Sequence, residues 1–344
     1  MRIAQVAPLY ESVPPIAYGA TERVVSYLTE ALVAAGHDVT LFATGDSRTQ
    51  AKRVATCERG LWRDASVWDT QCHHVRQLET VAQMADQFDI VHFHGEPMHL
   101  PVSRRLPCRH VTTMHGLLLP PDHGPLYAMF SDAPLVSISD DQRTPLPSAN
   151  WQATIHHGMP PDVLPFNAAG GDYLVFLGRM MPSKRPDLAI EIARRAGLPL
   201  KMAAKVHPGE QAYFRDEIEP LLARHGDVVE YLGEVGGEAR YAMLANARAL
   251  LFPVDWPEPF GMVLIEAMSC GTPVIAFRRG AVPEVVDDGV SGLIVDDVNQ
   301  AVSAVERIGR LDRAGCRRAF ERRFTADRMA NDYLTVYRRL LEET

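Results

Sequence analysis

The chain has 344 residues, of which 47% are hydrophobic and 23% charged, and its formal net charge is −8. The length suits two domains that each bury their own core, and the composition is ordinary for a globular protein. The negative charge argues against broad affinity for nucleic acid. The five cysteines are odd in number and show no C-x-x-C spacing, which argues against a disulfide framework or a zinc site and favours a reducing compartment.

The hydropathy pattern predicts no membrane-spanning helix. No run approaches 18 apolar residues, which leaves peripheral contact with a membrane open. Residues 1–8 are typical of a strand rather than of a signal peptide. We therefore expect a cytoplasmic protein.

The first elements form a strand, a helix and a strand. Buried strands are predicted at residues 3–7 and 39–43, with an amphipathic helix between them whose inner face carries Val24 and Leu28. This order implies a parallel sheet. Neither G-x-G-x-x-G nor G-x-x-x-x-G-K-[ST] is present. Gly19 opens the helix, where backbone N–H groups can approach a phosphate or an acceptor, although a plain helix-start glycine explains it equally well.

The rest of the first half continues the alternation. No regular structure is predicted for residues 48–69, and a helix is predicted for residues 72–88. Later strands are predicted at residues 134–139 and 152–158. Residues 159–171 are rich in proline, alanine and glycine, which predicts a linker between two domains.

Three histidines lie on or after two neighbouring predicted strands. His92 and His94 belong to a strand at residues 89–95, and His115 ends a strand at residues 110–116. Ligands of open α/β sheets bind at the carboxyl ends of strands. No carboxylate cluster accompanies these imidazoles, so a metal site is not predicted. We interpret His92 as a packed, hydrogen-bonded core residue.

The second half repeats the pattern of strands and helices. A strand beginning at Tyr173 leads to Gly178 and Arg179, and Lys184 precedes a helix. The remaining predicted elements are strands at residues 200–205, 228–232 and 247–254, helices at residues 209–224 and 260–268 and before Asn246, and a helical tail over residues 298–344. Four arginines of the tail are predicted to form a solvated face, namely Arg317, Arg318, Arg322 and Arg323.

The helix at residues 260–268 follows a buried strand and a turn that contains Pro259. Its first free N–H groups are expected at Phe260, Gly261 and Met262, and such a helix end attracts anions. A run of Cys270-Gly271-Thr272-Pro273 ends the helix.

Two glutamates flank this helix start. Glu258 precedes the helix and Glu266 lies two turns inside it, which separates them by roughly 12 Å at 1.5 Å per residue. One carboxylate can accept protons from sugar hydroxyls and the other from ribose hydroxyls of a sugar nucleotide. Two surface glutamates beside a core helix explain the spacing as well.

The segment Glu258-Pro-Phe-Gly-Met-Val-Leu-Ile-Glu266, followed by Gly271-Thr-Pro-Val274, resembles the E-x7-E motif of glycosyltransferase family 4. The resemblance implies an α/β protein of GT-B fold, with two Rossmann-like domains whose parallel sheets face each other across a cleft. It implies an N-terminal acceptor-side domain at residues 1–165, a C-terminal nucleotide-sugar donor domain at residues 166–322, and a helix at residues 323–344 that returns to the first domain.

The resemblance also implies roles for single residues. Gly178, Arg179 and Lys184 resemble the family's G-R…K-G element, whose cations bind the donor diphosphate, although Arg185 stands where the family often has glycine. His115 is implied to contact the sugar. The other donor-binding residues implied are Gly19, Lys205, Gly233, Glu234, Glu258, Pro259, Phe260, Gly261, Met262 and Glu266.

The expected function is that of a retaining glycosyltransferase. A nucleotide-sugar would be the donor, with a UDP-sugar favoured over a GDP- or ADP-sugar. The acceptor would be a sugar, a lipid-linked or a small-molecule hydroxyl compound. Catalysis would rest on His115, Glu258, Arg179 and Lys184, without metal or cofactor. A sugar-nucleotide epimerase of the same shape and a non-catalytic nucleotide-sugar binding protein are the alternatives.

Overall fold

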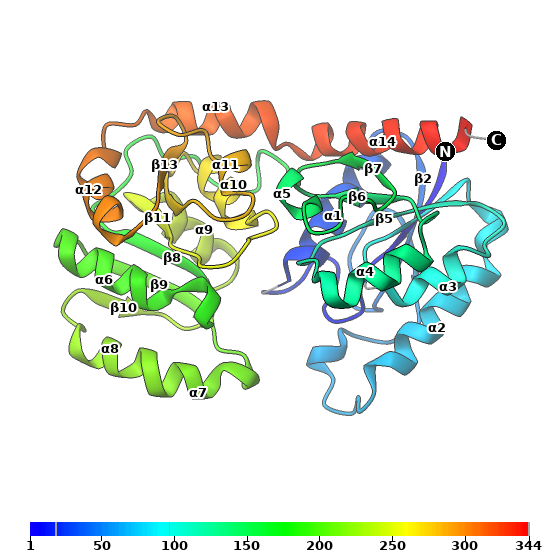
Figure 1. Ribbon diagram of the computed structural model, residues 1–344, viewed down its shortest axis with the longest axis horizontal. Helices are drawn as coiled ribbons and strands as arrows, with labels where there is room; N and C mark the ends of the chain where they lie inside the picture. The colour runs from blue at the N-terminus through cyan, green and yellow to red at the C-terminus, as the bar shows by residue number, and fades with distance from the viewer. Residues whose placement is uncertain (18, 96, 343–344) are drawn as a thin grey trace. The chain divides into compact units, whose positions relative to one another are not determined.

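The computed structural model describes residues 1–17, 19–95 and 97–342. The chain divides into two compact units (Figure 1). Unit 1 comprises Met1–Pro160 and Thr325–Thr344, and unit 2 comprises Pro161–Phe324. The C-terminal segment therefore packs with the unit that begins the chain.

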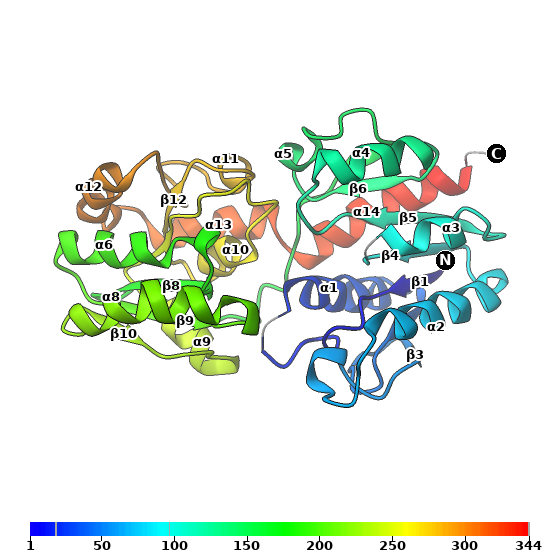
Figure 2. The same cartoon turned by 60° about the horizontal axis from the view of Figure 1, so that its bottom comes forward.

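The described part of unit 1 is built on a seven-stranded parallel sheet in the order β3-β2-β1-β4-β5-β6-β7. The strands are β1 (Arg2–Val6), β2 (Asp38–Ala43), β3 (Lys52–Ala55), β4 (Ile90–Phe93), β5 (Arg109–Thr113), β6 (Leu135–Ser137) and β7 (Trp151–Thr154). The helices are α1 (Ala20–Ala34), α2 (Thr70–Gln83), α3 (Leu100–Ser103), α4 (Pro120–Met129), α5 (Asp140–Arg143) and α14 (Ala326–Glu342). Figure 2 shows unit 1 from a second direction, and α1 packs against α14.

Unit 2, all of whose residues are described, has a six-stranded parallel sheet in the order β10-β9-β8-β11-β12-β13. The strands are β8 (Leu174–Arg179), β9 (Leu200–Lys205), β10 (Val229–Tyr231), β11 (Ala249–Phe252), β12 (Val274–Phe277) and β13 (Gly292–Val295). The helices are α6 (Pro186–Ala196), α7 (Gln211–Tyr213), α8 (Glu219–Arg224), α9 (Gly237–Ala245), α10 (Met262–Ser269), α11 (Val282–Val285), α12 (Val298–Ile308) and α13 (Arg313–Arg323). A buried core joins α6 and α12 to one face of this sheet.

The predicted pair of parallel sheets is confirmed, and three local predictions need correction. Strand β3 was not expected, because its four residues lie at the sheet edge, are mostly exposed and lack an apolar alternation. The helix predicted at residues 209–224 is broken into α7, a π-helical turn at Phe214–Ile218 and α8. The helix predicted at residues 72–88 ends at Gln83.

The predicted solvated face of tail arginines is wrong for two of the four. Arg317 donates from Nη1 to the carbonyl of Ser269 at 2.7 Å. Arg323 donates to the carbonyl of Glu284 and forms an ion pair with Asp287. These guanidinium groups therefore fasten α13 to neighbouring loops, whereas the side chains of Arg318 and Arg322 are more than 60% exposed.

Each sheet has one point where the strand order reverses direction. In unit 1 it lies between β1 and β4, and in unit 2 between β8 and β11. At such a point the loops after the two strands diverge and leave room for a ligand at the carboxyl ends. The loops that follow β8 and β11 contain Lys184 and Glu258, and the loop that follows β1 contains Gly19.

Candidate functional site

Lys184 and Glu258 form an ion pair at the reversal point of the unit 2 sheet. Oε2 of Glu258 accepts from Lys184 Nζ and, at 2.8 Å, from the indole Nε1 of Trp256. The ammonium group also lies 4.7 Å from the centre of the Trp256 ring, within cation–π range. Both charged side chains are largely buried, so this arrangement fixes the carboxylate and the ammonium group relative to each other.

A close backbone approach holds Glu258 in place. The N–H of Ala281 donates to the Glu258 carbonyl at 2.8 Å. A Cβ atom on Gly280 would lie 2.3 Å from the Glu258 nitrogen, and Gly280 has a φ of 54°. Only glycine fits this position without displacing the backbone of Glu258. The loop after β12 thus sets the position of the site glutamate.

Helix α10 begins two residues later than predicted. Its first residue is Met262, and its N-cap is Gly261, which has a φ of 83°. Phe260 is therefore outside the helix, and the free N–H groups begin at Met262. Because Glu258 precedes the helix by four residues, the predicted separation of the two glutamates along one helical axis does not apply.

Glu266 is paired with a cation that the sequence did not single out. This buried glutamate of α10 accepts from Nη2 of Arg240, which belongs to α9. Burial of an unpaired carboxylate would be costly, so Arg240 stabilises the ionised form at this position.

Arg179, at the end of β8, is paired with Glu210. This ion pair links the carboxyl end of β8 to the segment that follows β9. The two are close because Arg179 is in register with Lys205, the last residue of β9, and Glu210 follows that strand. Nε of Arg179 is buried and has no hydrogen-bond partner in the described part of the chain. This Nε–H group can therefore donate a hydrogen bond to a ligand without first breaking a bond within the protein.

Arg185 has the left-handed backbone conformation that glycine adopts easily. Its φ and ψ are both 53°, and it is the one non-glycine residue with positive φ among the described residues. Its guanidinium group donates to Asp187 at 2.8 Å and lies 3.4 Å from an Asp255 oxygen. Such a conformation costs a non-glycine residue about 1–3 kcal/mol, and these partly exposed ion pairs offset only part of that cost.

The other expected donor-binding residues are spread over the carboxyl edge of the same sheet. Gly178 is the last residue but one of β8, without a close contact at its Cβ position. Gly233 follows β10 with a φ of 69°, and its carbonyl accepts from Ala204 N–H at 2.8 Å. Pro259 is buried and Glu234 is exposed. The structure places all of these in unit 2, apart from Gly19.

In unit 1, His115 belongs to a cluster of imidazoles. His115 Nε2 lies 2.9 Å from His94 Nδ1, and its ring stacks against that of His157 at 5.2 Å between centroids. Burial lowers the pKa of His115 to about 3 and that of His94 well below its usual range. These side chains are therefore neutral at physiological pH.

The expectation for His92 is confirmed. It is completely buried, with Nδ1 2.6 Å from the Tyr337 hydroxyl and Nε2 2.7 Å from the Thr113 hydroxyl. Thr113 in turn lies 2.8 Å from the Tyr333 hydroxyl. Helix α14 thus supplies two tyrosines to a polar network inside unit 1.

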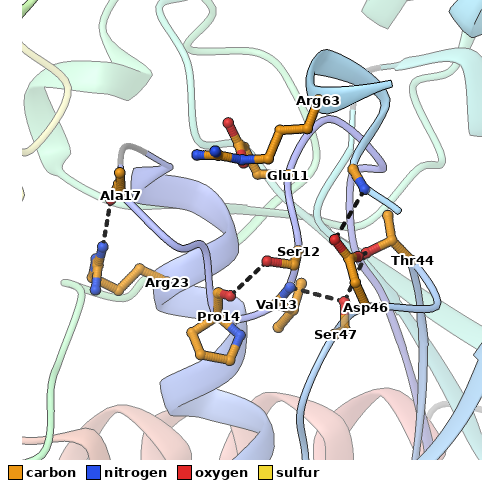
Figure 3. Close-up of polar contacts among 11 residues, drawn as sticks. Glu11, Ser12, Val13, Pro14, Ala17, Arg23, Thr44, Asp46, Ser47 and Arg63 are labelled. Atoms are coloured by element: carbon orange, nitrogen blue, oxygen red, sulfur yellow. Dashed lines mark hydrogen bonds and ion pairs between the residues drawn. The ribbon is translucent and has the colours of Figure 1, made fainter. Parts of the chain in front are cut away.

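Unit 1 contains two buried carboxylates near the start of α1, Glu11 in the loop after β1 and Glu22 in the helix itself. Glu11 is paired with Arg63 at 2.5 Å (Figure 3), and Glu22 belongs to the first turn of α1. Burial raises the pKa of Glu22 to about 7, and the negative charge of Glu11 adds to this effect. Gly19, the N-cap of α1, has a φ of 149°, and a Cβ there would lie 2.7 Å from Pro15 Cβ.

The same loop is fastened to the segment after β2. The N–H of Val13 donates to Ser47 Oγ at 2.8 Å, and the Ser47 hydroxyl is 2.9 Å from that of Thr44 (Figure 3). Arg23 donates to the Ala17 carbonyl at 2.8 Å. These bonds tie Val13 to the segment after β2 and Ala17 to helix α1.

The described residues contain no group of three or more histidine, cysteine or acidic side chains that could hold a metal ion. Among the same residues, no helix combines the length and apolar character needed to cross a membrane.

Two family descriptions match adjoining parts of the sequence. Residues 21–162 match "Glycosyltransferase Family 4", and residues 166–314 match "Glycosyl transferases group 1". The chain belongs to glycosyltransferase family 4. A curated family relative, the D-inositol 3-phosphate glycosyltransferase of Actinosynnema mirum, is 33% identical over 159 residues, which cover 43% of this chain and 36% of that protein. The matched segment thus spans less than half of the length of the curated relatives.

Solved structures of similar fold cover the whole chain. AviGT4, a glycosyltransferase involved in avilamycin A biosynthesis, superposes with a TM-score of 0.77 at 25% identity, covering 100% of this chain and 98% of that one. Anabaena Alr3699/HepE in complex with UDP and glucose gives 0.76 at 16% identity, covering 98% and 100%. The fold is that of GT-B glycosyltransferases.

Several residues around the candidate site were not found from the sequence. Glu210, Arg240 and Trp256 contact expected site residues from other elements. Gln5 and Tyr337 join the histidine network. The alternation of strands and helices gives no information on these partners, because all the contacts except that between Trp256 and Glu258 join segments well separated in the chain.

Proposed function

We propose that this protein is a retaining, metal-independent glycosyltransferase that moves a sugar from a nucleotide-sugar to an acceptor hydroxyl. The observation that carries the proposal is the Lys184–Glu258 pair at the reversal point of the unit 2 sheet, four residues before the N-terminus of α10. It offers an ammonium group, a carboxylate and free backbone N–H groups at one edge. A sugar diphosphate needs all three kinds of group.

In this proposal unit 2 binds the donor. Arg179 and Lys184 donate to the diphosphate, Glu258 accepts from sugar hydroxyls, and Glu266 accepts from the ribose. Charge-assisted hydrogen bonds of this kind are stronger than neutral ones. Arg179 and Lys184 are each paired with a glutamate, so the ion pairs orient the cations before they meet the diphosphate.

The base is proposed to lie near Lys205, Gly233 and Glu234, at the ends of β9 and β10. The diphosphate would approach Gly261 and Met262, where α10 begins. A UDP-sugar is favoured, because a protein of the same fold was solved with UDP and glucose. Unit 1 is proposed to carry the acceptor, with Gly19 beside it and His115 in contact with the sugar.

The proposed stereochemical outcome is retention. Inversion requires a general base that activates the acceptor behind the anomeric carbon. In a retaining reaction of this family, the departing phosphate oxygen takes the acceptor proton, and the protein stabilises the diphosphate and the carbon centre. Proton NMR of the first product made from an α-linked donor checks this, since an initial β-linked product contradicts it.

Independence from metal is supported by the two cations at the proposed diphosphate site and by the absence of a D-x-D sequence. We expect turnover to survive dialysis against EDTA. Loss of activity that added Mg²⁺ or Mn²⁺ restores would contradict this part of the proposal.

The acceptor is a sugar, a lipid-linked compound or a small molecule. The curated relatives are named for inositol 3-phosphate, and the matched region covers less than half of each of the first of them. A cytoplasmic location, with peripheral membrane contact if the acceptor is lipid-linked, completes the proposal. All five cysteines are free thiols, which suits a reducing compartment.

One experiment separates transfer from its alternatives. The protein is incubated with UDP-, GDP- and ADP-sugars, each with and without a mixture of glycoside acceptors. A transferase releases a nucleoside diphosphate, an epimerase forms a new sugar nucleotide, and a binding protein only gains thermal stability. Release of nucleoside diphosphate that requires acceptor supports the proposal, and either other result overturns it.

A further inference from the structure

A chain of hydrogen bonds runs from helix α14 through the sheet of unit 1 to His115. Its links are Tyr337 to Gln5 at 3.1 Å, Gln5 to His94 at 2.6 Å, and His94 to His115 at 2.9 Å. The side chains of Gln5, His94 and Tyr337 are buried. At the end of the chain, Nδ1 of His115 is buried and has no hydrogen-bond partner among the described residues.

The amide group of Gln5 gives this chain a direction. Its Nε2 donates to the Tyr337 hydroxyl, and its Oε1 faces Nε2 of His94. A carbonyl oxygen only accepts, so the proton of His94 lies on Nε2. Because His94 is neutral, its Nδ1 has a lone pair and no proton. The 2.9 Å contact therefore requires His115 to donate from its own Nε2.

The second branch of the network has the same direction. The Tyr337 hydroxyl accepts from Gln5, so its single proton is available for Nδ1 of His92 at 2.6 Å. His92 is neutral and fully buried, so it donates from Nε2 to the Thr113 hydroxyl at 2.7 Å. Every link then has one donor and one acceptor.

The unpaired Nδ1 of His115 also favours the tautomer in which Nε2 carries the proton. A buried N–H without a partner is rarer in proteins than an acceptor with unused capacity. With His115 protonated on Nε2, the unpaired Nδ1 is an acceptor. An unsatisfied buried group is still unfavourable, and a hydrogen bond from a hydroxyl donor would remove that cost.

We propose that Gln5 and His94 are positioning residues that hold His115 protonated on Nε2, so that its Nδ1 accepts a hydrogen bond from a hydroxyl group of the sugar. This inference rests on the proposed function, because it names the role of a residue expected to contact the sugar. It adds a chemical requirement. The sugar must present a hydrogen-bond donor to His115, and a group that only accepts is rejected.

The first test needs no substitution. In protein labelled with ¹⁵N-histidine, long-range ¹H–¹⁵N spectra distinguish a ring nitrogen that carries a proton from one that does not. A His115→Gln variant serves only to assign the signals. We expect Nε2 of His115 to be protonated and Nδ1 to be bare in the ligand-free protein. The opposite tautomer overturns the proposal.

The second test separates positioning from packing. Gln5→Met keeps the side-chain length but removes the acceptor for His94, and we expect the His115 signals to show a mixture of tautomers. Tyr333→Phe is the matched control, because it removes a hydroxyl from α14 that lies on the other branch of the network. An unchanged His115 pattern in Gln5→Met, or an equal change in Tyr333→Phe, contradicts the proposal.

The third test concerns the sugar. UDP-glucose derivatives in which one hydroxyl at a time is replaced by fluorine keep an acceptor but lose the donor. We expect one derivative to lose about tenfold in kcat/KM, the loss typical of one neutral hydrogen bond, and we expect His115→Ala to abolish this discrimination. Discrimination that survives His115→Ala contradicts the proposed contact.

The outcomes distinguish this inference from the proposed function. If the protein turns over nucleotide-sugars but His115 has the opposite tautomer, only the positioning role of Gln5 and His94 is contradicted. The expected tautomer in a protein that turns over no nucleotide-sugar sinks the proposed function and the sugar contact with it.

Discussion

Lys184 and Glu258 are 74 positions apart in the chain, yet their side chains form an ion pair that joins the loop after β8 to the loop after β11. The backbone reinforces the link, since the N–H of Asp255 donates to the Ser183 carbonyl at 2.9 Å. The two loops are therefore joined by a side-chain ion pair and a backbone hydrogen bond. Any ligand bound there meets a carboxylate and an ammonium group in a fixed relationship.

Lys184→Met is expected to lower kcat/KM for the nucleotide-sugar by about 10- to 100-fold, because it removes a charge-assisted hydrogen bond worth about 1.5–3 kcal/mol. Lys201→Met is the matched control, since Lys201 forms a 3.5 Å pair with Glu230 on the surface of the same unit. Steady-state kinetics of the purified variants measure the effect. Equal kinetics for both variants would place the diphosphate elsewhere.

Arg323→Ala is expected to destabilise the protein by about 1.5–3 kcal/mol, because it removes the charged donor to the partly buried Glu284 carbonyl and the ion pair with Asp287. Its neighbour Arg322 is 66% exposed and approaches Asp287 only at 3.5 Å, so Arg322→Ala should cost less than about 0.5 kcal/mol. Thermal unfolding of the pair gives the comparison. Similar midpoints for both variants would show that Arg323 does not fasten α13.

Gly19→Ala is expected to destabilise unit 1 more than Gly36→Ala does. Both glycines have positive φ, at 149° and 83°, so both substitutions strain the backbone by about 1 kcal/mol or more. Only at Gly19 would the new methyl group also collide with Pro15. Urea unfolding of the two variants measures the difference, and equal losses would mean that the loop gives way.

Glu22 is expected to make unit 1 less stable as the pH rises. Its folded pKa of about 7 lies above its ordinary value of 4.5, so the folded state binds more protons between these values. The penalty is nearly absent below pH 4.5, grows as the pH rises, and is complete above pH 7. Relative to the native protein, Glu22→Gln should gain about 2.5 kcal/mol between pH 5 and pH 8.

The measurement is urea unfolding in a Trp256→Phe background, where the remaining tryptophans, Trp62, Trp68 and Trp151, all lie in unit 1. The control is Glu30→Gln, which alters a more exposed carboxylate of the same helix. A gain that is independent of pH would contradict the raised pKa. A direct ¹³C NMR titration of the Glu22 carboxyl group in the folded protein should have its midpoint at this pKa of about 7.

Local patterns determined much of this protein. Apolar runs alternating with helical periodicity predicted two parallel sheets, because a parallel strand connection needs a crossover helix. The spacing of Glu258 and Glu266, with the segment from Gly178 to Lys184, identified family 4. These features are encoded within short stretches, so they can be recognised without knowing which segments meet.

Tertiary structure decided the rest. The start of α10 depends on the left-handed Gly261 and on Gly280, which lies against the backbone of Glu258 from another loop. Gln5 and Tyr337 are 332 positions apart, and their contact exists only because α14 packs in unit 1. Such contacts depend on which strands become neighbours, which the chain settles when it buries its apolar surface. No local pattern specifies in advance that a tyrosine of the last helix contacts a glutamine of the first strand.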